Sequence, residues 1–97
     1  MPPKGWQASP GNYNAKLFDV YPNPVSSSLS VYSRLKNESL VSLRLRNVLG
    51  QILYFKTEVN FNDRLVHSIN MREITNGMYF LEISTSASKS IYKILKN

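Results

Sequence analysis

Residues 40–46 read LVSLRLR, and the alternation within this stretch decides the fold class of the chain. Successive side chains of an extended strand point to opposite faces. Val41, Leu43 and Leu45 would therefore share one face, and the serine and the two arginines between and after them would share the other. The pattern predicts a strand with one face in a hydrophobic core and one face in water.

The same texture continues in both directions, over residues 17–97 of the 97-residue chain. Apolar runs rich in β-branched and aromatic residues begin every 11 to 13 residues, near the rhythm of about 8–12 residues that is typical of sandwiches and small barrels. Each such strand must hide one face, so the sequence predicts an all-β fold, a two-sheet sandwich of about seven antiparallel strands. The expected strands begin near Leu17, Ser28, Leu40, Gln51, Arg64, Gly77 and Lys89.

Two further stripes of alternate residues are expected to face the core. One contains Leu65, His67, Ile69 and Met71, and the other contains Tyr79, Leu81 and Ile83. A histidine within an apolar stripe is usually satisfied by a hydrogen bond, so His67 is interpreted as a structural residue and not as a ligand or base.

Prolines, glycines and polar clusters separate the expected strands. Pro22-Asn23-Pro24 should end the first strand, because proline cannot donate a hydrogen bond to a sheet. Gly50 lies between two strands and suits a tight hairpin with a positive φ, and Asn76-Gly77 is a turn signal before the sixth strand. Residues 36–39 and 60–63 are expected loops.

The first sixteen residues differ from the rest of the chain. Residues 1–16 contain three of the five prolines and two of the four glycines, and their apolar residues show no period. Such a segment cannot supply a ladder of backbone hydrogen bonds. We expect residues 1–16 to form a linker or loosely attached arm, and residues 17–97 to form the folded domain.

The composition gives no support to enzyme or metal chemistry. The chain has no cysteine and a single histidine, which excludes a disulfide framework, a thiolate zinc site and an iron–sulfur cluster. We find neither a convincing carboxylate pair nor a glycine-rich phosphate loop. We therefore expect no catalytic residue, no cofactor and no metal. The apolar runs are also too short to cross a bilayer, so direct membrane insertion is not expected.

The net charge of +6 comes from 12 basic and 6 acidic residues scattered along the chain. Scattered charge is typical of a solvated surface. Nucleic-acid binding would need a basic groove with stacking aromatics, to which Tyr32, Arg34, Arg44, Arg46 and Tyr54 could contribute, but the motifs of such domains are missing. We expect no nucleic-acid partner.

Four spaced blocks resemble the C-terminal sorting domain of the type IX secretion system of Bacteroidetes. The first is FDVYPNP at residues 18–24, and the second is LRLRNVLGQ at residues 43–51. The third spans residues 69–83 and contains NGMYFLEI, and the last is YKILKN at residues 92–97. The chain departs from the family pattern at Asn47 and Asn70, where an acidic residue is common, and at Ile74, where leucine is usual.

This resemblance implies a fold, a function and partners. The fold would be an immunoglobulin-like β-sandwich of about seven strands. The function would be a C-terminal sorting signal that directs an upstream cargo domain through the outer-membrane type IX translocon. The protein would be exported, passing through the periplasm to the cell surface or the medium. In many such proteins a surface sortase removes the domain and attaches the cargo to an anionic lipopolysaccharide, and the cut would be expected within residues 1–16.

A signal of this kind needs a surface for recognition. Our candidate for contact with the translocon is the last strand, because an exposed terminal strand can pair with a partner's sheet edge. Its residues are Lys93, Ile94, Leu95, Lys96 and Asn97. The remaining family positions are interpreted as turn or core residues, and they are Pro22, Asn23, Pro24, Gly50, Gly77 and Tyr79.

Two other functions stay open at this point. An accessory carbohydrate-binding or adhesive module would show a platform of exposed aromatics, to which Tyr32, Tyr54, Phe80 and Tyr92 could contribute, whereas scattered aromatics would favour the sorting signal. A purely structural spacer is the third possibility. The sequence does not specify the cargo or the oligomeric state.

Overall fold

The computed structural model describes residues 17–35, 39–60 and 65–97, and the regular structure in these ranges is entirely β. Each of the seven strands begins within one residue of its predicted start, which confirms the strand prediction. The strands are β1 (Phe18–Tyr21), β2 (Ser28–Ser33), β3 (Ser39–Arg46), β4 (Ile52–Asn60), β5 (Leu65–Asn70), β6 (Gly77–Ser84) and β7 (Lys89–Lys96).

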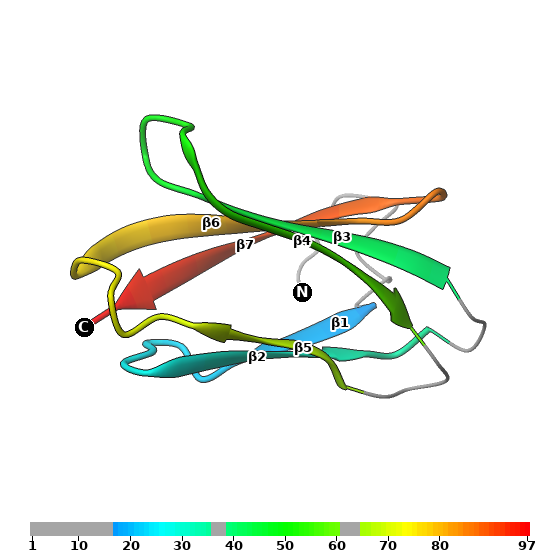
Figure 1. Cartoon of the computed structure of the whole chain (residues 1–97), viewed down its shortest axis with the longest axis horizontal. Helices are drawn as coiled ribbons and strands as arrows, with labels where there is room; N and C mark the ends of the chain where they lie inside the picture. The colour runs from blue at the N-terminus through cyan, green and yellow to red at the C-terminus, as the bar shows by residue number, and fades with distance from the viewer. Residues whose placement is uncertain (1–16, 36–38, 61–64) are drawn as a thin grey trace, which may run out of the picture.

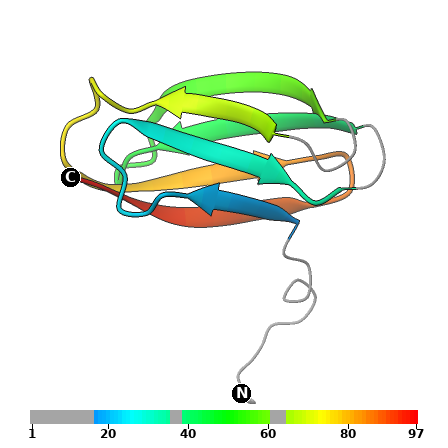
Figure 2. The same cartoon turned by 90° about the horizontal axis from the view of Figure 1, so that it is seen from below.

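The strands form two stacked sheets (Figure 1). The smaller sheet has the order β1-β2-β5, and the larger has the order β4-β3-β6-β7. All neighbouring strands are antiparallel. Figure 2 shows the smaller sheet lying over the larger one. The prediction of an all-β, immunoglobulin-like sandwich is therefore confirmed. The described ranges contain no helix that could cross a membrane.

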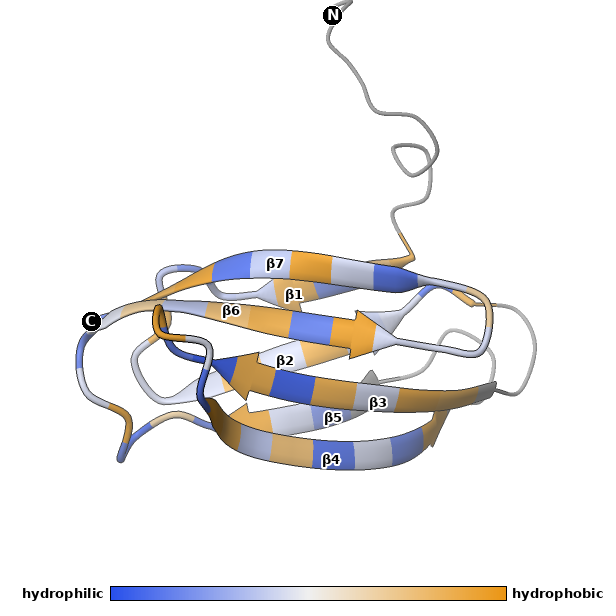
Figure 3. Cartoon of the chain, turned by 90° about the horizontal axis from the view of Figure 1, so that it is seen from above, coloured by the Kyte–Doolittle hydropathy of each residue, from blue (hydrophilic) through white to orange (hydrophobic). Residues whose placement is uncertain are grey.

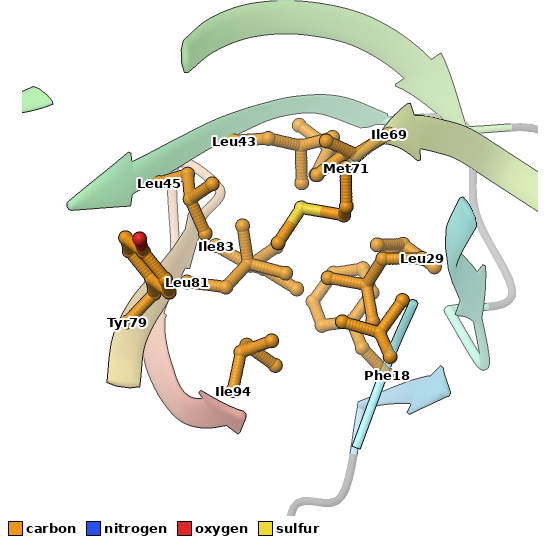
Figure 4. Packing of buried hydrophobic residues seen from close by; sticks show 13 residues of the cluster. Phe18, Leu29, Leu43, Leu45, Ile69, Met71, Tyr79, Leu81, Ile83 and Ile94 are labelled. Atoms are coloured by element: carbon orange, nitrogen blue, oxygen red, sulfur yellow. The ribbon is translucent and has the colours of Figure 1, made fainter. Parts of the chain in front are cut away.

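The core lies between the sheets and contains Val41, Leu43, Leu45, Ile69, Met71, Tyr79, Leu81 and Ile83 of the predicted stripes, together with residues of β1, β2 and β7 and Val25. The alternation of hydrophobic and hydrophilic residues along β3 can be followed in Figure 3, and the buried side chains pack as Figure 4 shows. Burying one large aliphatic or aromatic side chain stabilises a fold by about 1.5–3 kcal/mol. The buried apolar residues are Phe18, Val25, Leu29, Val31, Val41, Leu43, Leu45, Ile69, Met71, Tyr79, Leu81, Ile83 and Ile94.

Tyr79 adds a polar contact to this core. Its side chain is 8% exposed, and its hydroxyl donates to the carbonyl of Thr75 at 2.5 Å. A tyrosine near the start of a strand that bonds back to the chain a few residues upstream is the tyrosine corner of immunoglobulin-like sandwiches. The bond fixes the loop before β6 to the strand that follows it.

The predicted turns occur where proline and glycine placed them. β1 ends at Tyr21, directly before Pro22, and Gly50 has a φ of +86° in the hairpin between β3 and β4. Gly77 has a φ of +152° where β6 begins. The predicted arm at residues 1–16 lies outside the described residues, as do most of the predicted loops at residues 36–39 and 60–63.

Candidate recognition surface

Asn23 joins the first family block to the last strand. Its side-chain Nδ2 donates to the carbonyl oxygen of Lys93 at 2.7 Å, and its Oδ1 accepts from the amide of Leu95 at 2.9 Å. The peptide bonds that precede the two prolines, Tyr21–Pro22 and Asn23–Pro24, are cis. Neither proline has an amide to donate, so the donor and the acceptor come from the asparagine side chain between them.

Val25 extends this contact by backbone pairing. Its amide donates to the carbonyl of Leu95 at 2.8 Å, and its carbonyl accepts from the amide of Asn97 at 3.0 Å. The segment runs parallel to β7, with Val25 opposite Lys96, and the Val25 side chain is fully buried. We call residues 22–25 together with residues 93–97 the terminal clasp.

The terminal clasp changes the expected mode of recognition. The outward-facing backbone groups at Lys93, Leu95 and Asn97 are already bonded to Asn23 and Val25. A partner that added a strand to this stretch would first have to displace residues 23–25. No pattern in the sequence predicts a contact between residues 23–25 and the last strand. From the sequence alone, the edge of that strand is therefore expected to be free.

The five candidate residues of the last strand divide into two groups. The side chains of Lys93, Leu95 and Asn97 are exposed, whereas Ile94 is fully buried and Lys96 is 9% exposed. The Lys96 ammonium lies 3.4 Å from Oδ1 of Asn76. Only the first group can meet a partner without a change in the fold.

The other family positions are brought close to the same end of the sandwich. Gly77 pairs with Lys96, and Tyr79 pairs with Ile94. The hairpin that contains Gly50, the loop before β6, the loop after β1 and the last described residue all lie at one end in Figures 1 and 2. The conformation of Gly50 and Gly77 and the burial of Tyr79 agree with the turn and core roles expected for them.

A group of charges lies on the outer side of the larger sheet, between the β3–β4 hairpin and the start of β7. Glu82 is 3.2 Å from Arg46 and 3.5 Å from the ammonium of Lys89. Burial opposes ionisation of this carboxyl, but the hydrogen bond from Arg46 and the charges of Lys89 and Arg46 outweigh it, and the pKa of Glu82 lies below its ordinary value. Glu82 is thus a carboxylate whose charge is compensated within the domain.

Two important contacts were not found from the sequence. The sequence predicts only a turn at Asn23 and marks no role for Val25. The hallmark Tyr-Pro-Asn-Pro segment did carry a signal, since an amide side chain between two prolines has few local backbone partners. What the sequence could not show is that the partner lies 72 residues further along the chain.

The candidate aromatic residues do not form a platform. Tyr32 stacks on Tyr21 on the smaller sheet, with the ring centroids 5.3 Å apart. Tyr54 on β4 is half-buried and contacts His67. Phe80 on β6 is also half-buried, on the outer face of the same sheet. Tyr92 is half-buried, with its hydroxyl 3.3 Å from the Phe18 carbonyl. The four aromatic residues are scattered. This arrangement favours the sorting signal, because a carbohydrate-binding module would gather them on one face.

His67 has the structural environment expected of it. Its Nδ1 lies 3.0 Å from the Glu58 carboxylate, and its Nε2 contacts the hydroxyl of Tyr54. Burial and the negative charge of Glu58 raise the pKa of Tyr54. These contacts join β4 to β5 across one side of the sandwich. Within residues 17–35, 39–60 and 65–97, no group of three histidines or carboxylates could hold a metal ion.

The fold and the terminal clasp together define an immunoglobulin-like β-sandwich module in which segments from the two ends of the domain build one surface. The family described as the secretion system C-terminal sorting domain matches residues 19–97, and the chain belongs to that family. Domains of this family are C-terminal sorting signals of type IX secretion, which is also the function of this chain. The protein is accordingly exported. No curated protein matches the sequence.

Proposed function

We propose that the folded domain is bound in the periplasm by the outer-membrane type IX translocon, and that the terminal clasp is part of the surface that the translocon contacts. The observation that carries this proposal is the fixed position of the last strand. Asn23 and Val25 hold its outer edge while Lys93, Leu95 and Asn97 present their side chains to solvent.

A held strand is a better signal than a loose tail for a physical reason. Binding a flexible segment costs conformational entropy for each side chain and backbone unit that becomes ordered. The terminal clasp orders the last strand when the domain folds. Binding to a partner therefore costs less conformational entropy, and the binding free energy is more favourable. The Lys93 ammonium adds a charge that favours an acidic partner surface.

The proposal includes what happens to the cargo. The domain is a signal and not an enzyme, and it would follow an upstream cargo domain through the translocon. A surface sortase would cut within the arm at residues 1–16, leaving the cargo at the cell surface or in the medium.

A reporter export assay tests the proposal. Lys16–Asn97 is placed after a signal peptide and a fluorescent protein in a bacterium with a type IX system, with a strain lacking the translocon as the comparison. We expect surface or medium fluorescence only when the translocon is present. Fluorescence that stays in the periplasm with the intact domain would overturn the proposal.

The contribution of the terminal clasp is tested with point variants, because deletion of residues 93–97 would also remove Ile94 from the core. Lys93→Glu reverses an exposed charge on β7 and should lower export. Lys56→Glu is the control on β4, at the opposite edge of the same sheet. Because Lys56 lies 3.9 Å from Glu58, thermal unfolding first shows that both variants are folded. Equal export by the two variants would remove Lys93 from the contact surface.

A further inference from the structure

The tip of the β3–β4 hairpin shows two aliphatic side chains to water. Val48 is 62% exposed and Leu49 is 80% exposed, the highest value among the large apolar residues that the structure describes. The hairpin rises from the larger sheet above β6 (Figure 1). Single exposed leucines are normal on a protein surface, whereas exposed aliphatic residues that lie together indicate an interaction site.

The tip is ordered by its own hydrogen bonds. Oδ1 of Asn47 accepts from the amides of Leu49 and Gln51 at 2.9 and 3.0 Å, and Nδ2 of Asn47 donates to the Gln51 side chain at 2.7 Å. A guanidinium nitrogen of Arg46 donates to the Gly50 carbonyl at 3.0 Å. The exposure of Val48 and Leu49 is therefore built into the turn, and a partner would not have to order the loop on binding.

A hollow of about 400 Å³ lies between the tip and the outer side of the sheet. Val48 lines it from the hairpin, Phe80 from β6 and Ile91 from β7. Ile91 is itself 63% exposed. Arg46, Asn47, Gly50 and Glu82 complete the lining. The hollow offers mostly apolar walls with charge at one side, which suits a side chain inserted from a partner.

The charges around the hollow favour an acidic occupant. Strand pairing places Arg46, Phe80 and Lys93 in one row, and Arg44, Glu82 and Ile91 in the next. Lys89 follows opposite Ser84. Among the described residues of this outer face there are four basic side chains, Arg44, Arg46, Lys89 and Lys93, against one carboxylate. That carboxylate, Glu82, is already paired with Arg46 and Lys89.

We propose that this hairpin face, made of Val48, Leu49, Phe80, Ile91 and Lys93, docks an acidic segment of the type IX translocon. One bulky apolar side chain of that segment enters the hollow, and a neighbouring carboxylate lies near Lys93. The inference rests on the proposed function, because it names the translocon as the partner. A protein segment fits better than an anionic membrane, since a membrane surface would cover the tip but would not fill the hollow behind it.

The test uses aspartate substitutions at exposed positions, which remove apolar area and also repel an acidic partner. Leu49→Asp alters the tip, and Ile91→Asp alters the wall of the hollow. The matched control is Leu40→Asp, because Leu40 is 62% exposed on β3, at the end of that strand away from the hairpin. All three variants should unfold at the wild-type temperature, since none of these side chains is buried.

Binding and export are then measured for the same proteins. The labelled domain is titrated with outer membranes that contain or lack the translocon and with phosphatidylglycerol vesicles, and the export reporter is run in parallel. We expect Leu49→Asp and Ile91→Asp to weaken binding to translocon membranes by at least about tenfold and to lower export, while Leu40→Asp behaves as the wild type.

The possible failures are distinguishable. If the wild type is exported and all variants bind equally well, the hairpin face is not the docking surface and the proposed function stands. If the same substitutions abolish binding to phosphatidylglycerol vesicles and not to the translocon membranes, the face binds lipid and the inference is wrong. If the wild type neither binds translocon membranes nor is exported, the proposed function fails and the inference fails with it.

Discussion

The side chain of Asn23 accepts a hydrogen bond from the backbone amide of Leu95, a residue 72 positions further along the chain, at 2.9 Å. The same side chain donates to Lys93. A side-chain amide carries one carbonyl and one N–H group in the arrangement of a peptide unit, so it can stand in for a residue of a neighbouring strand. The last strand is thereby protected along the part of its edge that the terminal clasp covers, and an unprotected edge strand would favour aggregation.

Asn23→Ala and Asn23→Asp should both destabilise the domain. Alanine removes both hydrogen bonds. Aspartate can still accept from Leu95 but can no longer donate to the Lys93 carbonyl, and it sets two oxygens against each other. We expect each variant to lower the free energy of unfolding by about 1–2 kcal/mol, measured by urea denaturation.

Hydrogen exchange locates the effect. The Leu95 amide should lose protection in Asn23→Ala, because its acceptor is removed, and should lose less in Asn23→Asp, because a carboxylate oxygen can still accept its hydrogen bond. Ser26→Ala, at an exposed position in the same loop, is the control and should change the free energy of unfolding by less than about 0.5 kcal/mol. Asn23→Asp with wild-type stability would contradict the bidentate role of Asn23.

Tyr79→Phe should destabilise the domain more than Tyr92→Phe does. The Tyr79 hydroxyl is buried and bonds to the Thr75 carbonyl at 2.5 Å, whereas the Tyr92 hydroxyl lies on a half-buried residue 3.3 Å from its acceptor. Removing the Tyr79 hydroxyl leaves a carbonyl without its partner, and we expect a loss of about 1–2 kcal/mol. The loss of stability of each variant is measured by thermal unfolding. An equal loss in the two variants would show that the Tyr79 hydrogen bond contributes no more to stability than the Tyr92 hydrogen bond.

Stability should fall in acid partly through Glu82. The folded pKa of this carboxyl is lowered by its partners, so the ionised form stabilises the fold at neutral pH. That contribution is fully present above the ordinary pKa of a glutamate and is lost as the pH falls from there through the lowered folded pKa. Glu82→Gln should flatten the dependence of the unfolding free energy on pH in that range. An unchanged slope in Glu82→Gln would show that other carboxylates cause the acid sensitivity.

Gly50 should accept asparagine but not valine. Its φ of +86° lies in the left-handed region, while a Cβ built there meets no other atom within 4 Å. The cost of substitution is thus conformational and not steric. Asparagine adopts this region readily, so we expect Gly50→Asn to cost less than about 0.5 kcal/mol and Gly50→Val about 1–2 kcal/mol, measured by denaturant unfolding. Equal losses would indicate that an unseen contact, and not φ, restricts the position.

The local features of this fold could be predicted from the sequence, and the long-range ones could not. The alternation in β3 predicted that Val41, Leu43 and Leu45 face the core, and Gly50 predicted the hairpin. Such signals lie within one strand or one turn, where the backbone geometry of neighbouring residues sets the direction of their side chains. The order of the strands in each sheet has no comparable local signature.

The candidate site shows the same division. The last strand was identified from its sequence, but its contact with Asn23 depends on how the two sheets close against each other. Asn47 is similar: a departure from the family pattern by sequence, it proved to be the residue whose side chain organises the hairpin tip. A single polar side chain has no period, so its partner becomes visible only when the fold is known.

The burial of Ile94 has a consequence for when the signal comes into existence during synthesis. β7 leaves the ribosome after the other six strands, yet Ile94 fills the core opposite Tyr79, and the strand also supplies the partner groups for Val25. A chain interrupted before Ile94 would leave one edge of β6 without most of its hydrogen-bond partners and the core without the Ile94 side chain. The sandwich therefore becomes complete only after the whole segment upstream of β7 has been translated, so a truncated chain lacks the folded signal.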